Sequence, residues 1–191
     1  MSITEPQYKL KGITTEHPSI TTLAGNLNLV KHPSGGYFAE TDRPTETSST
    51  FTTLLDDNVD RNASSLIHFM MTCEAPRGQM HTNVLSRTIH ILQRGRGKYV
   101  LIHPDNRIET FIVGFNAEKG ERTQWVVEPG VYKGCVLLPL TEGAEESNQD
   151  ILWVSEVVVP GFDFQDMKFL DKGKLSEKVG EEKAVEMEFL L

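Results

Sequence analysis

Residues 78–102, GQMHTNVLSRTIHILQRGRGKYVLI, are the stretch that most constrains what this chain can fold into. Runs rich in β-branched and apolar residues lie on both sides of a turn that contains Gly95 and Gly97. Such runs around a glycine turn are typical of a β-hairpin. Residues 98–103 alternate in the way of a half-buried strand. The stretch therefore predicts a strand, a bend, a long strand, a tight turn and a further strand.

The same pattern recurs along most of the chain. Further strands are predicted within residues 32–43, 64–72, 107–113, 124–127, 133–138 and 151–159, with Gly, Pro or Asn between them. Helix is predicted only near the ends, in a short segment from His17 and in one or two short helices after residue 174, where apolar residues recur at helical spacing. About eight to eleven short strands separated by turn signals are typical of an all-β sandwich or barrel.

The 191 residues contain neither an internal repeat nor a linker, so we expect one domain over 1–191. Residues 1–16 are polar and are predicted to form a flexible N-terminal arm, and residues 174–191 a helical C-terminal tail. The segment 44–63 is rich in Thr, Ser, Asp and Asn. A polar stretch of this length between strands is typical of a long loop, and we consider it a candidate lid.

The charge and the cysteines narrow the setting in which the protein works. The formal net charge is −8, from 27 acidic and 19 basic residues, which argues against nucleic-acid binding because that requires a basic surface. No apolar run approaches the ~20 residues of a membrane span, and the polar N-terminus does not resemble a signal peptide. Cys73 and Cys135 are too far apart in sequence for a metal motif, so both are predicted to be buried, reduced thiols. These features predict a soluble protein of the cytoplasm, with the nucleus as an alternative compartment.

Four residue types suited to acid–base chemistry occur on the predicted strands. His81 could act as a base, Tyr37 as an acid and Arg87 as an electrostatic clamp in proton abstraction next to a carbonyl group. Glu156 interrupts an otherwise apolar strand, and a carboxylate in such a place is either paired or functional. We expected Arg87 to be its partner. His90 has the opposite strand parity to Arg87, so both face the lumen only if a bulge intervenes.

Other polar side chains on these strands are predicted to line a barrel and bind its ligand. They are Glu40, Asn83, His90, Gln93, Tyr99, Gln124 and Tyr132.

Four motifs in this order resemble one protein family. They read GGYFAETDR, RTIHILQRGRGKYVLI, GERTQWVVEPGVYKG and SEVVVPGFDF. Together they resemble the small cupins of unknown function first characterised structurally in budding yeast, which are RmlC-like, and the resemblance extends from about Leu27 to Leu191. It implies a double-stranded β-helix, or jelly-roll barrel, with a ligand cavity inside. It also implies a homodimer, and it aligns His81 and His90 with the two family histidines.

Metal-binding cupins use a His-x-His pair, a later glutamate and a further histidine. Here the pair reads His81-Thr82-Asn83, Arg87 stands near the position of the carboxylate, and Cys135 lies where the last histidine might be sought. Bacterial relatives carry an acidic pair where this chain has Ser86 and Arg87. An arginine has no lone pair for a metal and repels a divalent ion. The sequence therefore favours a site without a metal, and a divalent ion held by His81, His90 and Glu156 is the weaker alternative.

The function predicted from these observations is binding of a small polar ligand in the barrel. A sugar, a nucleotide-sugar or another carbonyl compound is the expected class. The enzyme hypothesis is an isomerase or epimerase, with His81 as base, Tyr37 or Tyr132 as acid and Arg87 as clamp. The alternatives are a binding protein without turnover and a metal-dependent cupin enzyme. Resemblance in fold to the sugar epimerases does not decide among them.

Overall fold

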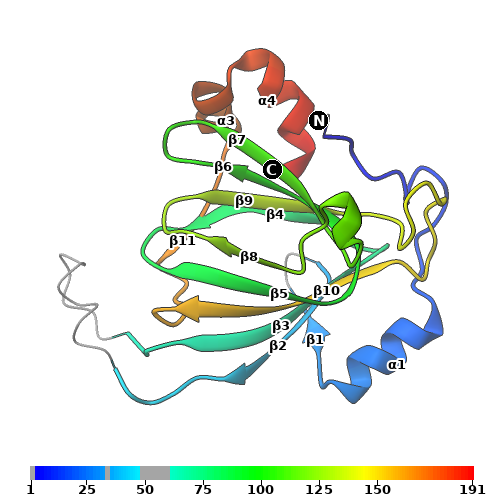
Figure 1. Ribbon diagram of the computed structural model, residues 1–191, viewed down its shortest axis with the longest axis horizontal. Helices are drawn as coiled ribbons and strands as arrows, with labels where there is room; N and C mark the ends of the chain where they lie inside the picture. Colours follow the sequence, from blue (N-terminus) through cyan, green and yellow to red (C-terminus); the bar gives the residue numbers. More distant parts are fainter. Residues whose placement is uncertain (1–2, 33–34, 48–60) are drawn as a thin grey trace.

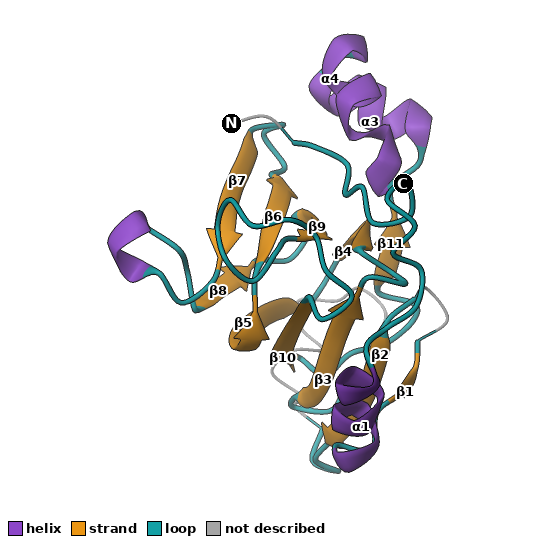
Figure 2. Ribbon diagram, turned by 90° about the vertical axis from the view of Figure 1, so that its right-hand side faces the viewer, coloured by secondary structure: helices purple, strands orange, loops and turns teal. Residues whose placement is uncertain are grey.

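The computed structural model describes residues 3–32, 35–47 and 61–191 and shows two antiparallel β-sheets packed against each other (Figure 1). The strand order is β1-β2-β3-β10-β5-β8 in the six-stranded sheet and β11-β4-β9-β6-β7 in the five-stranded sheet. Figure 2 looks roughly along the strands and shows one sheet lying above the other. This is the two-sheet sandwich of a cupin jelly roll, so the predicted all-β fold is confirmed.

The strand bounds follow the predicted segments closely. The six-stranded sheet contains β1 (Val30–Lys31), β2 (Tyr37–Asp42), β3 (Ser65–Thr72), β5 (Arg87–Gly95), β8 (Gln124–Val127) and β10 (Ile151–Val159). The five-stranded sheet contains β4 (Arg77–Asn83), β6 (Gly97–Ile102), β7 (Ile108–Val113), β9 (Tyr132–Leu137) and β11 (Met167–Phe169). The sequence analysis did not predict β11, whose three residues are too few to show an alternating pattern.

The turn between β5 and β6 depends on Gly95. Its φ is 94°, a conformation that residues with a side chain rarely adopt. A Cβ atom added there would lie 1.7 Å from the backbone oxygen of Ile151, so the position has no room for a side chain. The predicted turn between two strands is therefore confirmed, but the predicted hairpin is wrong: β5 pairs with β10 and β8 and β6 pairs with β9 and β7, so the turn carries the chain from one sheet to the other.

The main hydrophobic cluster lies between the two sheets. It includes Leu92, Trp125 and Val154 of the six-stranded sheet and Tyr99 and Cys135 of the five-stranded sheet. Because these residues come from both sheets, they form the interior of the barrel. Cys73 and Cys135 are free and buried, as predicted.

The N-terminal residues contact the barrel instead of extending as a loose arm. Tyr8 is fully buried in the main cluster, and its hydroxyl donates to a carboxylate oxygen of Asp150 at 2.9 Å. The backbone N–H of Gln7 donates to Glu146 at 2.7 Å. A single aromatic residue in a polar segment has no periodicity, so the sequence pattern does not reveal this anchor.

Helices pack against the outer face of each sheet, and α1 reaches only the part of the six-stranded sheet around Tyr37 and Met70 (Figure 2). Helix α1 (Pro18–Asn26) begins after His17, whose side chain accepts from the N–H of Ser19, and it packs on Tyr37 and Met70 of the six-stranded sheet. Helices α3 (Lys172–Val179) and α4 (Glu181–Met187) pack on the five-stranded sheet, followed by a 3-10 helix, η2 (Glu188–Leu190). A second short 3-10 helix, η1 (Ala117–Lys119), precedes β8.

Two predictions about the surroundings can be compared with this fold. Within the described ranges, none of the helices combines the length and the apolar character needed to cross a membrane. The candidate lid spans 44–63, and its residues 48–60 lie outside the described residues.

Candidate functional site

One level of the barrel carries ionisable side chains from both sheets. In the five-stranded sheet, Lys133 of β9 pairs in register with His81 of β4. In the six-stranded sheet, Glu156 of β10 pairs with His90 of β5. Directly paired residues of neighbouring strands project from the same face of a sheet. Lys133 and His81 therefore face Glu156 and His90 across the lumen, and we call these four residues the lumen cluster.

The ammonium group of Lys133 joins the two sheets at this level. Its Nζ atom lies 2.8 Å from Oε2 of Glu156 and 2.9 Å from Nε2 of His90. Lys133 is 5% exposed and His90 is fully buried. An ammonium group only donates hydrogen bonds, so Nε2 of His90 is the acceptor and the imidazole is neutral in this arrangement.

Burial and the Lys133 charge set the protonation of the other three groups. Burial lowers the pKa of His81 to about 4 and that of His90 to about 3, and the nearby Lys133 lowers both further in the same direction. Burial alone would raise the pKa of Glu156, but Lys133 and the two histidines hold it at about 2. At neutral pH the lumen cluster is therefore a carboxylate–ammonium pair between two neutral imidazoles.

The hydrogen bond of His81 defines its tautomer. Its Nδ1 atom lies 2.8 Å from the backbone oxygen of Gln79. A carbonyl oxygen only accepts, so Nδ1 carries the proton and Nε2 keeps a lone pair. With a low pKa, this nitrogen is available at neutral pH as a base or as a hydrogen-bond acceptor.

Aromatic rings hold the imidazole of His90 from the side. Trp125 stacks on it with ring centroids 4.8 Å apart and an angle of 11° between the planes. Tyr99 meets it edge-on at 5.6 Å. Both rings are buried, so they fix the orientation of His90 and keep water away from its inner face.

Asn83, two residues after His81 on β4, is a further polar group in the lumen. The side-chain amide of Asn83 donates to Oγ1 of Thr88 at 3.3 Å, and its Oδ1 atom has no hydrogen-bond partner among the described residues. Asn83 is 8% exposed. A buried acceptor without a donor is unfavourable, so a ligand hydroxyl that reached this oxygen would supply its missing hydrogen bond.

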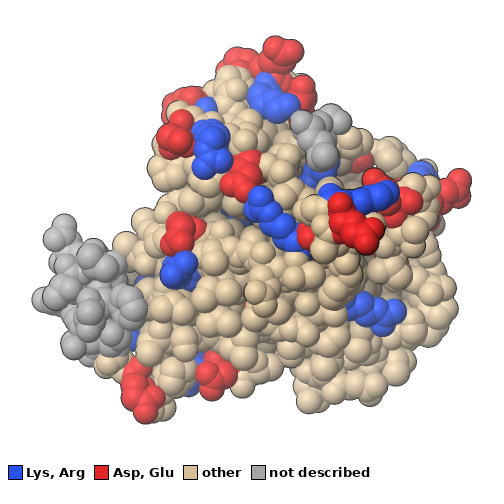
Figure 3. Space-filling model, in the orientation of Figure 1, with Lys and Arg blue, Asp and Glu red and all other residues tan. Residues whose placement is uncertain are grey.

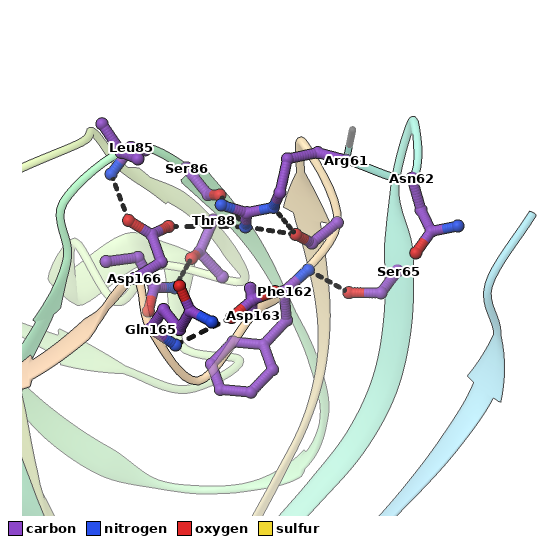
Figure 4. Close-up of polar contacts among 12 residues, drawn as sticks. Arg61, Asn62, Ser65, Leu85, Ser86, Thr88, Phe162, Asp163, Gln165 and Asp166 are labelled. Carbon is purple, nitrogen blue, oxygen red and sulfur yellow. Dashed lines mark hydrogen bonds and ion pairs between the residues drawn. The ribbon is translucent and has the colours of Figure 1, made fainter. Parts of the chain in front are cut away.

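Arg61 closes the same end of the barrel (Figure 4). Its guanidinium donates to the backbone oxygen of Gly161 and, at 3.1 Å, to Oγ of Ser86, and it lies 3.6 Å from a carboxylate oxygen of Asp166. Asp166 also accepts from the N–H of Leu85 at 2.7 Å. Arg61 and Asp166 are both buried. This ion pair joins the residues just before β3 to the segment between β10 and β11.

Comparison with known proteins identifies the family. The sequence profile described as "Cupin superfamily (DUF985)" matches residues 21–170. The chain belongs to this cupin family. It is also 44% identical over 193 residues to the uncharacterized protein YML079W of Saccharomyces cerevisiae, covering 97% of this chain and 93% of the yeast protein.

Solved structures share the cupin fold at lower identity. A hypothetical protein from Leishmania major has a TM-score of 0.67 at 24% identity, covering 82% of this chain and 90% of that one. Protein SO0799 from Shewanella oneidensis has a TM-score of 0.66 at 22% identity, covering 87% of this chain and 93% of that one. These structures support the cupin fold and carry no information on the reaction.

The cupin lumen contains five of the residues that the sequence analysis selected. They are His81, Asn83, His90, Tyr99 and Glu156. Arg87, the expected partner of Glu156, is on the outside of β5 and pairs with Glu128 at 2.9 Å. Side chains alternate between the two faces of a strand. His90 faces inward, and Arg87 lies three residues before it, so Arg87 faces outward.

The two tyrosines considered as acids lie outside the lumen. Tyr37 packs beneath α1, and its hydroxyl donates to Oε2 of Glu16 at 2.6 Å. Tyr132 packs with the cluster beneath the C-terminal helices, and Lys178 lies over its ring at 5.6 Å. Neither hydroxyl is brought to the lumen cluster. Tyr99 is the tyrosine that contacts His90.

Three predicted ligand-binding residues also lie away from the lumen cluster. Glu40 is exposed near the end of β2 and forms a bidentate pair with Arg43 at 2.9 and 2.7 Å. Gln93 is exposed and donates to Oγ of Ser155 at 2.9 Å. Gln124 lines a separate cavity at the edge of the sandwich.

Lys133 is the functional residue that the sequence analysis missed. Lys133 could have been found in the same way as Glu156, because it is a charged residue in an otherwise apolar strand, YKGCVL. Burying an unpaired charge is unfavourable, so two buried charges of opposite sign on different strands are expected to pair with each other. Cys135, two residues further along β9, was examined instead as a place for a metal ligand.

The donor set of the lumen cluster does not fit a divalent metal. Nε2 of His90 and Oε2 of Glu156 are both bonded to the Lys133 ammonium, which occupies the place that a metal ion would need and repels a cation. Groups of three or more His, Cys, Asp or Glu side chains placed to hold a metal are not found in the described part of the chain. No step of the proposed chemistry therefore uses a metal.

Proposed function

We propose that this cupin binds a small polar carbonyl compound in its barrel and catalyses proton transfer next to the carbonyl group, as an isomerase or epimerase does. The observation that carries the proposal is the buried Lys133–Glu156 pair between two neutral histidines. Proton abstraction next to a carbonyl requires a base without a proton and a fixed positive charge that stabilises the enolate. His81 and Lys133 are those two groups.

His81 is the proposed base because its Nε2 lone pair is available at neutral pH. A base with a pKa of about 4 is weak, so the transfer depends on stabilisation of the oxyanion that forms. Lys133 supplies this stabilisation and takes the clamp role that the sequence analysis gave to Arg87. The Lys133 ammonium has three N–H groups and two of them have partners in the protein, so one remains for a ligand oxygen.

Glu156, Asn83 and Tyr99 complete the proposed site. Glu156 neutralises Lys133, so the cation is not left unpaired in a buried place. The free Oδ1 of Asn83 accepts from a ligand hydroxyl. Tyr99 is the proposed acid in place of Tyr37 or Tyr132, since its ring adjoins His90. Burial raises the pKa of Tyr99 well above its usual value, so its hydroxyl stays protonated.

Solvent exchange tests this function directly. The purified protein is incubated in D2O with a panel of keto-sugars and related carbonyl compounds, and deuterium incorporation is measured by mass spectrometry. We expect incorporation into at least one compound. His81→Ala and Lys133→Met should each reduce the rate about 100-fold or more, and Gln93→Ala, outside the lumen, should leave it unchanged.

The alternative is a binding protein without turnover. It is favoured by the closed arrangement of the lumen cluster, in which the charges already satisfy each other in the described structure. A ligand that co-purifies and is recovered chemically intact, together with no exchange into any compound of the panel, would establish this alternative and reject the enzyme.

A cytoplasmic homodimer is the proposed state of the protein. Four apolar residues lie in register across the outer face of the six-stranded sheet, in the order Leu66, Val157, Ile89 and Val126. The first three are half-buried and Val126 is 40% exposed. The lower part of the surface in Figure 3, over β3, β5 and β10, carries few charged side chains. An uncharged apolar row on a sheet face fits a second copy of the same surface.

A further inference from the structure

A cavity of about 290 Å³ opens at the edge of the sandwich, between the β6–β7 hairpin and β8. Its size is close to the lower end of the range for small-molecule sites, ~300 Å³. Its polar and aromatic lining residues are His103, Glu109, Arg122, Gln124, Trp125 and Glu128. None of the four residues of the lumen cluster lines it.

Two apolar side chains separate this edge cavity from the lumen cluster. In the five-stranded sheet, Leu101 lies in register between Glu109 of β7 and Lys133 of β9. In the six-stranded sheet, Trp125 lies beside His90 and stacks on it. Leu101 and Trp125 both line the edge cavity, so its floor is the wall of the lumen.

Trp125 carries a donor that lacks an acceptor. It is 6% exposed, and its indole N–H has no hydrogen-bond partner among the described residues. Buried donors in folded proteins are paired with very few exceptions. This unpaired N–H belongs to a residue that lines the cavity, so an acceptor on a bound ligand would supply the missing hydrogen bond on reaching it.

The rim of the edge cavity is already ordered. Glu109 accepts from Nη1 of Arg122 at 2.9 Å and lies 3.0 Å from Nε2 of His103, and Arg107, outside the lining, approaches it at 3.6 Å. The Arg122 guanidinium lies 4.0 Å above the ring of Phe111. Groups held in place before binding lose little freedom when a ligand arrives.

The lining matches hydroxyl groups better than anions. Glu109 and Glu128 are acceptors, Arg122 and Trp125 are donors, and the amide of Gln124 is both. Glu109 is paired with Arg122 and Glu128 with Arg87, so these cations are already neutralised and would bind a phosphate poorly. Figure 3 looks onto this edge and shows acidic and basic side chains near one another, without a wide patch of one sign. Hydroxyl groups donate and accept at once, so several of them on one ring satisfy such a set.

We infer that the edge cavity is a second binding site, for a neutral ring that carries several hydroxyl groups. This chemistry is shared by free monosaccharides and by the ribose of a nucleoside. The ligand accepts from Trp125 and donates to Glu109. The inference does not rest on the reaction proposed for the lumen.

The indole N–H of Trp125 is a direct reporter of this site. The chain contains two tryptophans, and Trp153 on the other face of the six-stranded sheet donates to His68 at 3.2 Å. Trp153→Phe therefore leaves one indole signal in a ¹H–¹⁵N spectrum. Glucose, galactose, mannose, uridine and glucose 6-phosphate are titrated against it.

The expected result is a saturable shift of that signal with at least one neutral compound. A shift with the sugars alone would identify a monosaccharide site, and a shift with uridine alone would identify a nucleoside site. Gln124→Ala, which removes an exposed side chain of the lining, should weaken binding about five- to tenfold through loss of one hydrogen bond. His81→Ala should leave the affinity unchanged.

Three results would overturn the inference. They are the absence of a shift with every neutral compound, equal or tighter binding of glucose 6-phosphate, and a shift that His81→Ala abolishes while Gln124→Ala does not affect it. The last result would place the ligand in the lumen. Binding at the edge cavity with no proton exchange anywhere would reject the proposed reaction and leave the second site standing.

Discussion

Lys133 and Glu156 come from opposite sheets of the barrel, and their charged atoms lie 2.8 Å apart. Each residue sits in an otherwise apolar strand, and their side chains are 7% and 13% exposed. The pair therefore links the two sheets at the level where His81 and His90 also lie. Its energetic and chemical consequences can be measured separately.

Replacing Lys133 alone should destabilise the fold. Lys133→Met leaves the Glu156 carboxylate buried without its partner, and breaking a buried pair in this way costs about 3–5 kcal/mol. The double variant Lys133→Met/Glu156→Leu should recover most of this loss, because neither charge is then buried. Chemical denaturation of both variants measures the effect. Equal stability of the single variant and the wild type would show that the pair is solvated.

Lys133→Met should also raise the pKa of His90 and the pKa of Glu156. Besides burial, the Lys133 charge lowers the pKa of His90 to about 3, and it opposes the effect of burial on Glu156. Without the ammonium, His90 is left beside a carboxylate that favours its protonated form. NMR titration of the His90 ring in Lys133→Met should show a higher pKa than in the wild type, and an unchanged pKa would contradict the geometry.

Stability should fall in mild acid because of the two lumen histidines. An unfolded histidine titrates near a pKa of about 6.5, whereas in the folded chain the pKa is about 4 for His81 and about 3 for His90. Between these values the unfolded chain binds more protons, so the free energy of unfolding decreases as the pH falls from about 6.5 toward 4.

Glu156 extends the same trend to lower pH. Its folded pKa of about 2 lies below its ordinary value of 4.5, so its contribution is complete above about pH 4.5 and is lost as the pH falls toward 2. Denaturation curves at a series of pH values check both ranges. His90→Gln should flatten the slope between pH 6.5 and 4, and an unchanged slope would contradict the burial of this histidine.

Arg61 should contribute to stability through its buried ion pair. Arg61→Met removes the donors to Gly161 and Ser86 and leaves the Asp166 carboxylate without a cation, so a loss of about 3–5 kcal/mol is expected. Arg87→Met, which removes the exposed pair with Glu128, should cost no more than about 1 kcal/mol. Thermal unfolding of the two variants gives the comparison, and equal losses would contradict the burial of Arg61.

Tyr37 should be structural. Tyr37→Phe removes a hydroxyl that donates to the buried Glu16 carboxylate at 2.6 Å, and hydrogen bonds to charged groups contribute about 1.5–3 kcal/mol. We expect a stability loss of this size and unchanged proton exchange or ligand affinity. A variant with normal stability and lost activity would return Tyr37 to the role of acid that the sequence analysis gave it.

The proposed homodimer depends on the apolar row of the six-stranded sheet. Ile89→Asp places a charge in the middle of that row and should convert the dimer to a monomer in sedimentation equilibrium. Leu10→Asp is the control, since Leu10 is 82% exposed and lies in the N-terminal segment. A wild type that is monomeric throughout the accessible concentration range would reject the dimer.

Local sequence patterns were enough to predict most of the strands, the turn at Gly95 and the helices near the two ends. These features follow from alternation over a few residues and from turn chemistry, both of which are local. The sequence also drew attention to His90 and Glu156, because polar or charged residues within apolar strands stand out without knowledge of the fold.

Which side chains meet depends on the pairing and packing of strands that are distant in the sequence. A register shift between Gly78 and His81 turns His81 toward Lys133, and another in the pairing of β10 with β5 lies next to Gln93. Each shift changes which face the following residues occupy, and no local pattern encodes it. Arg87 lies outside because its strand parity is opposite to that of the inward His90, and Tyr37 lies beneath α1. The packing of the two sheets made Lys133 the partner of Glu156. The pairing of strands distant in sequence determines the lumen, because a side chain's face depends on the register of its neighbours.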